Sequence, residues 1–345
     1  MTQTIALPVE EASQAGGARR TVIGLATQLG LNETERGRVG LVVTELANNL
    51  ARHARAGLLL VHPLERRGVV GIELLALDQG PGMEHVGECL RDGYSTAGTA
   101  GNGMGAIARL SDLFEIYTLP SVGTAILCRL WAAPLPPRTH PIQLGAVALP
   151  KLGEEASGDA WSVVRAGDRC RVIVADGLGH GILAAQAANE AVRVFHEQSD
   201  RSPKEILEAS HRALRSTRGA AVAIAEINLP QQTVRFAGVG NISAMLLPVQ
   251  HASQPRQNWV SFNGTIGHEV RKIQEYTYDW MTEGVMVMHS DGLSSQWRLD
   301  QYPGLLSKHP SLIAGVLYRD FHRDRDDITV VVMRQVPIKS LPPAL

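Results

Sequence analysis

The chain has 345 residues, of which 44% are hydrophobic and 19% charged, and its formal net charge is −1. This length has room for two ordinary domains, each with a core of its own. The near-neutral charge provides no basic excess for nucleic acid, so we expect no nucleic-acid partner.

Nothing in the sequence predicts a membrane segment or an export signal. The first twenty residues lack a basic leader followed by an apolar core. No uncharged apolar run approaches the roughly 18 residues that a membrane helix needs. The three cysteines, Cys89, Cys128 and Cys170, are far apart and lack metal-binding spacing, as expected of free thiols in a reducing compartment. We therefore expect a cytoplasmic protein without membrane partners.

The first 131 residues predict a mixed α/β domain. Apolar residues alternate near the N-terminus, recur at helical spacing further on, and then form continuous runs typical of buried strands. The expected elements are an edge strand within residues 1–15, helices over 18–29 and 33–56, strands over 57–62 and 69–77, a helix from 106, and a strand over 123–131.

The second expected helix carries a row of polar residues. Glu45, Asn49 and His53 stand at i, i+4 and i+8, which places them on one side of the helix within roughly 80°. Taken alone, such a row is more often a solvated face than a site. The motifs that follow it favour a site.

Two glycine-rich motifs follow. In D-Q-G-P-G, Asp78 ends a strand, where its carboxylate could accept a hydrogen bond from an exocyclic amine while Gly80 and Gly82 leave room for a planar ligand. The stretch G-Y-S-T-A-G-T-A-G-N-G-M-G then precedes a helix, and a glycine-rich loop at a helix N-terminus is suited to bind phosphates. Each motif is weak by itself, but their order is specific.

Together, E-L-A-N-N-L-A-R-H-A, D-Q-G-P-G, G-N-G-M-G and a strand opening with G-T resemble the GHKL-type (Bergerat) ATP-binding domain of histidine kinases, gyrase and Hsp90. Within that superfamily, residues 10–131 look most like the anti-sigma and stressosome-switch serine kinases (RsbW-like and, more closely, RsbT-like). The resemblance implies an α/β sandwich that binds ATP with Mg²⁺, Asn49 as the Mg²⁺ ligand, and Glu45 as the general base. The nucleotide-binding residues that it implies are Asn49, His53, Asp78, Gly80, Gly82, Gly101, Gly103, Gly105 and Thr124.

A proline-rich stretch separates this domain from the rest of the chain. Residues 132–141, A-A-P-L-P-P-R-T-H-P, hold four prolines, which disfavour helix and internal strand and make a semi-rigid spacer. We expect domains over 1–131 and 142–345 with this linker between them.

The second half predicts strands that end at aspartates. Its expected strands include an antiparallel meander over 220–248, and helices are expected to end near residues 197 and 216. Four strand ends carry an acidic residue: Asp159, Asp176, Asp291 and Asp326. Converging carboxylates repel each other, so such an arrangement suits bound cations. The alternative is four unrelated aspartates at surface turns.

The motifs S-G-D, V-A-D-G-L-G-H-G, A-G-V-G-N, S-D-G-L and R-D-D-I-T over residues 142–335 are similar to the metal-dependent serine/threonine phosphatases of the SpoIIE and RsbX group. The resemblance implies a PPM-type α-β-β-α sandwich that binds two Mn²⁺ or Mg²⁺ ions. The implied ligands are Asp159, Asp176, the Gly177 carbonyl, Asp291 and Asp326, with Asp176 bridging the ions and Asp327 in support. His180 is a candidate for phosphate contact or proton transfer, or else it only caps the next helix.

These features predict an α+β protein of two domains with opposed activities, a protein-serine/threonine kinase and a metal-dependent phosphatase. The resembled families imply STAS-domain anti-sigma antagonists or stressosome proteins as substrates, with a sigma factor or downstream effector as a further partner. One alternative is a phosphatase whose first half only binds ATP and a partner protein. A catalytically silent scaffold is the third reading.

Overall fold

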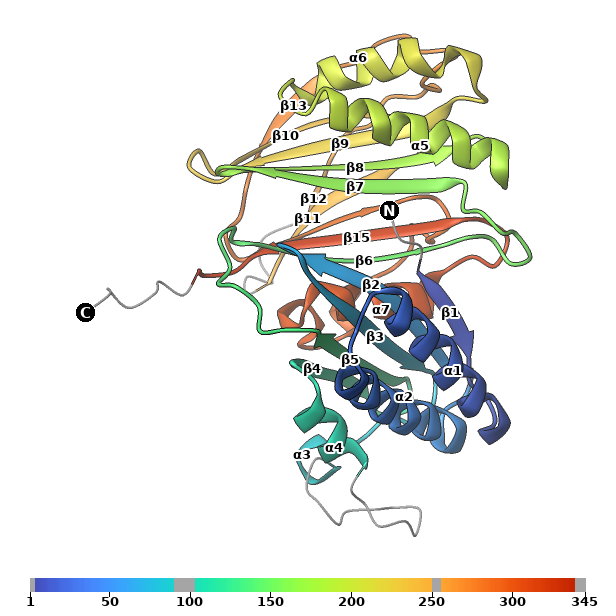
Figure 1. Ribbon diagram of the computed structural model, residues 1–345. Coiled ribbons are helices and arrows are strands. Elements are labelled where there is room, and N and C mark those ends of the chain that lie inside the picture. The colour runs from blue at the N-terminus through green and yellow to red at the C-terminus, as the bar shows by residue number, and fades with distance from the viewer. Residues whose placement is uncertain (1–3, 90–102, 250–255, 339–345) are drawn as a thin grey trace. The chain divides into compact units, whose positions relative to one another are not determined.

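The computed structural model describes residues 4–89, 103–249 and 256–338. The chain forms two compact units (Figure 1). The N-terminal unit consists of residues 2–137 together with 300–319, and the C-terminal unit consists of 138–299 and 320–345. A segment from the second half of the sequence is therefore part of the N-terminal unit. None of the helices in the described ranges is both long and apolar enough to cross a bilayer.

The N-terminal unit is built on one antiparallel sheet with the strand order β1-β2-β3-β5-β4. Its strands are β1 Ile5–Pro8, β2 Leu58–Arg66, β3 Val69–Asp78, β4 Leu113–Leu119 and β5 Gly123–Trp131. β1 lies at the edge, as the alternation of apolar residues near the N-terminus predicted. β4 was not predicted, because none of its residues except Tyr117 is fully buried and its apolar pattern is weak.

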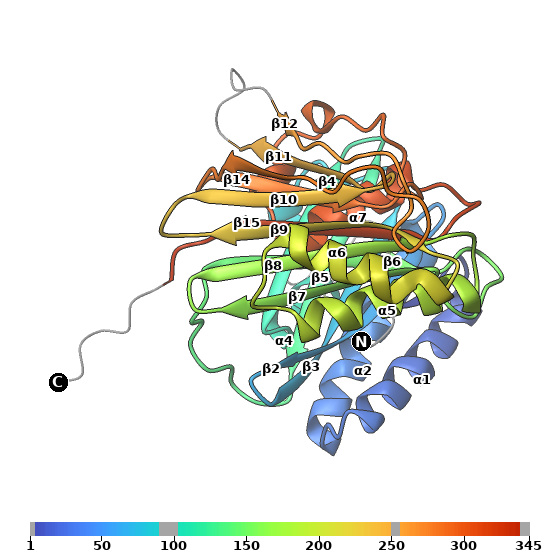
Figure 2. The same ribbon diagram turned by 90° about the horizontal axis from the view of Figure 1, so that it is seen from above.

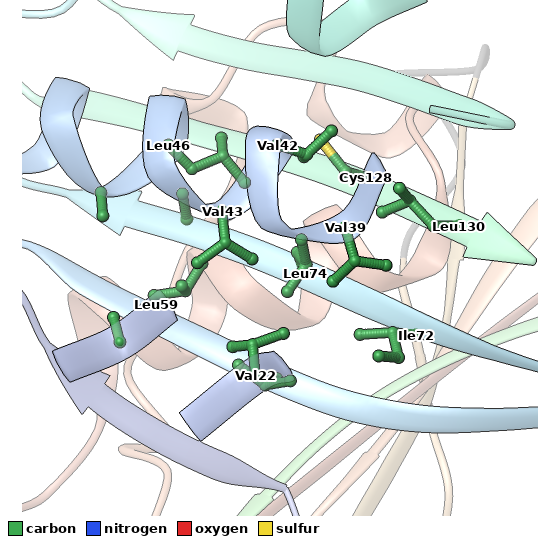
Figure 3. Close-up of a cluster of buried hydrophobic side chains, with 14 of the residues drawn as sticks. Val22, Val39, Val42, Val43, Leu46, Leu59, Ile72, Leu74, Cys128 and Leu130 are labelled. Carbon is green, nitrogen blue, oxygen red and sulfur yellow. The ribbon is translucent and has the colours of Figure 1, made fainter. Parts of the chain in front are cut away.

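Two long helices cover one face of this sheet. They are α1 Ala12–Gln28 and α2 Glu33–His53, and the shorter α3 Val86–Cys89 and α4 Gly103–Leu110 follow β3. Buried α2 side chains such as Val43 and Leu46 pack over Leu59 and Leu74 of the sheet (Figure 3). Burying such residues stabilises the unit by about 1.5–3 kcal/mol each.

Helix α2 begins with a capping box at Asn32. The Asn32 side chain accepts a hydrogen bond from the Glu35 backbone N–H at 3.0 Å, and the Glu35 carboxylate accepts one from the Asn32 N–H at 2.8 Å. This capping box satisfies two backbone donors that the first turn leaves free. The helix ends at His53, three residues before the predicted end, because Ala54 has extended backbone angles.

The other face of the sheet carries a helix that the sequence analysis did not assign. This helix, α7 Pro310–Phe321, has nine of its twelve residues buried, as expected of a helix that is apolar around most of its circumference. At Gly315 it approaches β3 so closely that a Cβ atom would lie 2.4 Å from a methyl carbon of Leu75. Glycine is required at this close approach.

The C-terminal unit contains two five-stranded sheets. The first has the order β13-β10-β9-β8-β7 and the second the order β12-β11-β14-β15-β6. Their strands are β6 Ile142–Leu149, β7 Asp159–Ala166, β8 Arg169–Gly177, β9 Ala220–Asn228, β10 Thr233–Val239, β11 Ser243–Pro248, β12 Gln257–Asn258, β13 Glu275–Asp279, β14 Gly284–His289 and β15 Ile328–Gln335. A short 3-10 turn lies at Leu214–Ser216 in this unit, another at Leu299–Gln301 where the chain passes to the N-terminal unit, and a third at Leu305–Ser307 within the N-terminal unit.

The two sheets share an apolar core. Alternate residues of β8, such as Val172 and Val174, face Met286 and Met288 of the second sheet, whereas Ile173 and Ala175 face the opposite way. On that outer side lie α5 Ile182–Glu197 and α6 Pro203–Ala213, side by side across the strands (Figure 2). Period-two alternation therefore divides β8 between two cores. The predicted fold class, two α+β domains, is confirmed.

One predicted connection is wrong. The sequence favoured a meander of β9, β10 and β11, but β11 pairs with β12 and β14 in the second sheet. The chain leaves the first sheet at Gly240, whose φ of +100° is a conformation that favours glycine. The turn separates two strands that a simple hairpin would have joined.

Candidate functional site

Two aspartates face each other at one end of the first sheet of the C-terminal unit. Asp159 begins β7 and stands directly opposite Asp176, near the end of the adjacent strand β8. β7 and β8 are immediate neighbours in this sheet, so both carboxylates lie at the same edge. Asp159 is only 7% exposed, and one of its oxygens, Oδ1, has no hydrogen-bond partner among the described residues.

Neighbouring polar groups orient the other carboxylates. Oδ2 of Asp159 accepts a hydrogen bond from Ser290 Oγ at 2.5 Å, and Asp291 accepts one from the Asn241 side-chain amide at 2.7 Å. Asp326 and Asp327 directly precede β15. Asp327, which the sequence analysis treated only as support, is 2% exposed and accepts from the Lys151 backbone N–H at 2.9 Å.

The electrostatics of these aspartates show that they influence one another. Burial raises the pKa of the Asp176 carboxyl, and repulsion from Asp159, Asp291 and Asp326 raises it further. Burial also raises the pKa of Asp159, partly offset by the Ser290 hydrogen bond. Like charges brought together in this way disfavour ionisation unless a cation is present.

The chemistry of these side chains suits a hard divalent cation. The donor set is made of carboxylate oxygens, and the partnerless buried Oδ1 of Asp159 is an acceptor that a cation would satisfy. Among the residues that the structure describes, no group of three or more His, Cys, Asp or Glu side chains is arranged so that it could hold a metal ion. Gly177, whose carbonyl is a predicted metal ligand, directly follows Asp176. A Cβ atom on Gly177 would lie 2.0 Å from the Ala184 carbonyl oxygen, so there is no room for a side chain at this position.

His180 lies on the loop after β8. Its Nδ1 is 2.5 Å from Oε1 of Glu154, and the N-cap of α5 is Gly181, which provides no side-chain cap. The histidine ring is therefore oriented by a carboxylate rather than by the helix N-terminus, which argues against the capping alternative. Glu154 was not singled out from the sequence.

A second group of predicted residues meets at the end of β3 in the N-terminal unit. Asp78 stands opposite Thr124 on β5, and its Oδ1 accepts a hydrogen bond from the Gly80 N–H at 2.7 Å. Burial raises the pKa of Asp78, while the Gly80 hydrogen bond and the nearby His53 lower it. A partly buried carboxylate acceptor is suited to bind an amine donor.

Two glycines of this site leave no room for side chains. Gly82 has a φ of +72°, and a Cβ there would lie 2.4 Å from the Leu119 carbonyl oxygen. At Gly80 a Cβ would lie 2.7 Å from the His53 carbonyl oxygen. The backbone can therefore follow this path only with glycine at both positions.

Of the remaining predicted residues, Glu45 and Asn49 lie on α2, and Gly103 and Gly105 lie on α4. A Cβ on Gly103 would be 2.6 Å from Oε2 of Glu45, so this carboxylate stands at the N-terminus of α4, which begins three residues before the predicted start. The side-chain amide nitrogen of Asn49 is buried and has no partner among the described residues, so it is available to a ligand. Gly105 is buried in α4. Gly101 lies outside the described residues.

The structure adds supporting residues that the sequence analysis missed. Ser290 and Asn241 hold Asp159 and Asp291, and Arg319 of α7 donates to the Asp78 carbonyl oxygen at 3.0 Å. Ser290 and Asn241 do stand inside the motifs S-D-G-L and A-G-V-G-N, which was an available signal. Arg319 stands in no motif.

Family models match both halves of the chain. The histidine kinase-like ATPase domain matches residues 7–129, and stage II sporulation protein E (SpoIIE) matches residues 166–336. The serine/threonine-protein kinase RsbT of Bacillus subtilis is 32% identical over 114 residues, which cover 33% of this chain and 86% of RsbT. The phosphoserine phosphatase RsbX of the same organism is 25% identical over 154 residues, 44% of this chain and 75% of RsbX.

Solved structures give the same assignment for the C-terminal fold. A chain from a structure of the bacterial stressosome is 25% identical with a TM-score of 0.52, and covers 56% of this chain and 99% of its own length. RsbX in complex with magnesium is 22% identical with a TM-score of 0.50, and covers 59% of this chain and 99% of its own length. The chain therefore belongs, through its N-terminal part, to the histidine kinase-like ATPase family, and joins to it a SpoIIE- and RsbX-like domain with the protein phosphatase fold.

Proposed function

We propose that this chain is a two-way phosphorylation switch. Its N-terminal unit transfers phosphate from ATP to a serine or threonine of a partner protein, and its C-terminal unit removes that phosphate. The observation that carries the proposal is the repulsion that Asp159, Asp291 and Asp326 exert on Asp176, in a chain that also has Glu45 beside the start of α4 and Asn49 one helical turn further along α2.

In the N-terminal unit, Asp78 and Thr124 would hold adenine, and Asn49 would hold Mg²⁺ between the phosphates. Glu45, one helical turn from Asn49, would accept the proton of the attacking hydroxyl while the oxygen bonds to the γ-phosphorus and ADP leaves. Phosphoryl transfer depends mainly on positioning and charge neutralisation, which suits a site built from a helix and a glycine-rich turn.

In the C-terminal unit, Asp159, Asp176, Asp291 and Asp326 would hold two Mn²⁺ or Mg²⁺ ions, and the Gly177 carbonyl would contribute a further oxygen. When bound, such ions lower the pKa of a coordinated water and neutralise the phosphate oxygens. Ser290 and Asn241 keep Asp159 and Asp291 in place through their hydrogen bonds. Support from the surrounding protein of this kind tunes ligand geometry.

His180 would return a proton to the departing serine oxygen. The phosphorus–oxygen bond to the substrate breaks as the water oxygen bonds to phosphorus, and the alkoxide needs a proton. His180 lies on the loop that follows Asp176, and its Nδ1 is 2.5 Å from Oε1 of Glu154, so the imidazole is held on this loop and in its protonated form would donate from Nε2.

We infer that the substrates are STAS-domain proteins of the anti-sigma antagonist or stressosome type, with a sigma factor or downstream effector as a further partner. Support comes from the two relatives, RsbT and RsbX, whose resemblances occur here in one chain, and from the similarity to a stressosome structure. Because both units belong to one chain, each has a high effective concentration at the same target.

The test combines the purified full chain with a STAS-domain protein encoded beside it, labelled ATP and Mg²⁺, followed by removal of ATP and addition of Mn²⁺. We expect label to appear on the partner and then disappear. With Glu45→Ala no label should appear although ATP still binds, and with Asp176→Asn the label should persist.

Two other outcomes would contradict parts of the proposal. If a pre-phosphorylated partner is hydrolysed but no variant ever transfers label, the N-terminal unit is an ATP-dependent binding module. If Asp176→Asn hydrolyses the phosphoprotein as fast as the wild type, the two-metal assignment is wrong.

A further inference from the structure

We propose that Arg218 binds the phosphate group of the phosphoprotein substrate at the phosphatase site of the C-terminal unit. The inference rests on the proposed function, because it needs a phosphate held beside the paired aspartates Asp159 and Asp176. It deepens that function by assigning a phosphate-binding side chain that none of the sequence motifs contains. The contacts involved all lie within residues 138–299, in the C-terminal unit.

The pairing of β8 with β9 brings Arg218 to the loop that follows the proposed metal ligands of β8. The last residue of β8, Gly177, pairs with the first residue of β9. One step beyond the strands, the Leu178 N–H donates to the Gly219 carbonyl oxygen at 2.9 Å. The next step in the same antiparallel register sets Arg218 beside Gly179.

The guanidinium of Arg218 lies against the backbone of Gly179. A Cβ atom on Gly179 would lie 3.0 Å from Nη1 of Arg218. The φ of this glycine is +89°, a conformation that strains other residues, so the position stays free of a side chain. Gly179 is three residues after Asp176 and directly before His180. The guanidinium therefore lies beside the loop that carries a proposed metal ligand and the proposed proton donor.

The backbone on both sides of Arg218 is held by hydrogen bonds, whereas its side chain is exposed. Oγ1 of Thr217 accepts from the Gly219 N–H at 3.0 Å, and the Thr217 carbonyl oxygen lies 3.1 Å from Nε2 of His268. The exposed Arg218 side chain makes no hydrogen bond or ion pair with any residue in the described ranges. Its five N–H donors and permanent charge are thus available to an oxyanion.

Arginines at the other end of the same strands differ in this respect. Arg171 of β8 and Arg235 of β10 both form ion pairs with the buried Glu226 of β9. Arg218, at the end of β9 that adjoins the proposed metal site, has no such carboxylate partner among the described residues. A structural ion pair therefore explains the two arginines at the far end of the strands but not Arg218.

The charges of the proposed site favour an additional cation. The four proposed aspartate ligands and two divalent ions would cancel, because four negative charges meet four positive charges. A phosphomonoester then adds about two negative charges at neutral pH. A guanidinium can donate two parallel hydrogen bonds to phosphate oxygens. Arg218 would thus neutralise part of the phosphate charge and orient the group.

The experiment uses the full chain loaded with Mn²⁺ and phenylphosphonate, a non-hydrolysable analogue of a phosphomonoester. Calorimetry measures the affinity for phenylphosphonate, and turnover of p-nitrophenyl phosphate gives KM and kcat separately. With Arg218→Ala we expect phenylphosphonate to bind about 10-fold more weakly and KM to rise by a similar factor, while kcat stays within about threefold of the wild type. Arg218→Lys keeps the charge but loses the planar fork, so it should recover part of the loss.

Arg201→Ala is the matched control. Arg201 is also exposed, and it follows the far end of α5, a helix of 16 residues that begins at the loop and spans about 24 Å. Its replacement should leave KM and phenylphosphonate affinity unchanged. Titration of Mn²⁺ binding to every variant separates an effect on the phosphate from an effect on the metal ligands.

The outcomes separate the inference from the proposed function. If Arg218→Ala binds phenylphosphonate as tightly as the wild type, or if its only defect is a loss of Mn²⁺ affinity, Arg218 does not bind the phosphate, and the proposed function stands. An equal loss of phenylphosphonate affinity in Arg201→Ala would also refute the assignment. If the wild type neither binds Mn²⁺ nor turns over p-nitrophenyl phosphate, the proposed function itself fails, and the role of Arg218 fails with it.

Discussion

Asp159 and Asp176 occupy directly opposed positions on the paired strands β7 and β8. Like charges directly opposite in a sheet are destabilising, and here both carboxyls are also removed from water, which raises the pKa of each. The fold therefore carries a local electrostatic cost at the end of its first sheet. A bound cation would offset that cost.

Replacing Asp176 should show this cost directly. Asp176→Asn keeps the side-chain volume and removes one charge, so we expect the metal-free chain to gain about 1–3 kcal/mol in free energy of unfolding while phosphatase turnover falls at least about 100-fold. Asp168→Asn, at the exposed turn of the same hairpin, is the matched control and should change stability by less than about 0.5 kcal/mol. Denaturant unfolding and turnover on a phosphoprotein measure both. Equal effects of the two variants would contradict the assignment.

Stability should depend on pH and metal together. Burial and the neighbouring carboxylates raise the pKa of Asp176 from 3.8 to about 9. Between these two pH values the unfolded chain has lost the proton that the folded chain keeps, so the stability of the metal-free chain falls as pH rises. Bound Mn²⁺ replaces the proton, so the stabilisation by Mn²⁺ should be larger at about pH 8 than at about pH 5. It should reach about 2.7 kcal/mol when Mn²⁺ is at 100 times its dissociation constant. A Tm shift that is equal at both pH values would argue against carboxylate ligands.

We expect Ser290 to affect metal binding because its hydroxyl holds the Asp159 carboxylate. Ser290→Ala removes the hydroxyl that donates to Asp159 and that accepts from the Thr329 N–H at 2.9 Å, leaving a buried carboxylate less well held. We expect Mn²⁺ affinity to fall about 10–100-fold, with turnover largely recovered at high Mn²⁺. A Mn²⁺ titration of turnover tests this. A loss that excess Mn²⁺ does not repair would point to a structural defect instead.

Asp78 should select adenine over guanine. Asp78→Asn replaces one acceptor oxygen by an amide donor that cannot accept from the adenine amine, so affinity for ATP should fall about 10–100-fold. Calorimetry with ATP and GTP on both forms measures the selectivity. Parallel losses for both nucleotides would mean that Asp78 supports the pocket without recognising the base.

Gly82 and Gly68 provide a matched pair for backbone constraint. Both have positive φ, +72° and +77°, but a Cβ at Gly82 would meet the Leu119 carbonyl at 2.4 Å, whereas none of the described atoms lies within 4 Å of one at Gly68. Gly68→Ala should cost about 1–2 kcal/mol from the backbone alone, and Gly82→Ala about 1–3 kcal/mol more from the clash. Urea unfolding compares them, and equal costs would contradict the argument.

The sequence by itself determined the fold class, the two family resemblances and the aspartates at the strand ends. Each of these follows from local rules: periodicity, short motifs, and the position of a side chain at the end of a strand. The family models and relatives confirm the two resemblances. The roles of individual site residues stay predictions.

Tertiary structure alone decided which strands are neighbours and where α7 belongs. The direct pairing of Asp159 with Asp176 and the transfer of β11 to the second sheet depend on contacts between residues far apart in sequence. Helix α7 lies in the N-terminal unit, because Gly315 and Ser311 fit β3 side chains that stand 238 or more positions earlier. Local patterns report which faces of an element are apolar, but they do not specify which distant surface will bury them.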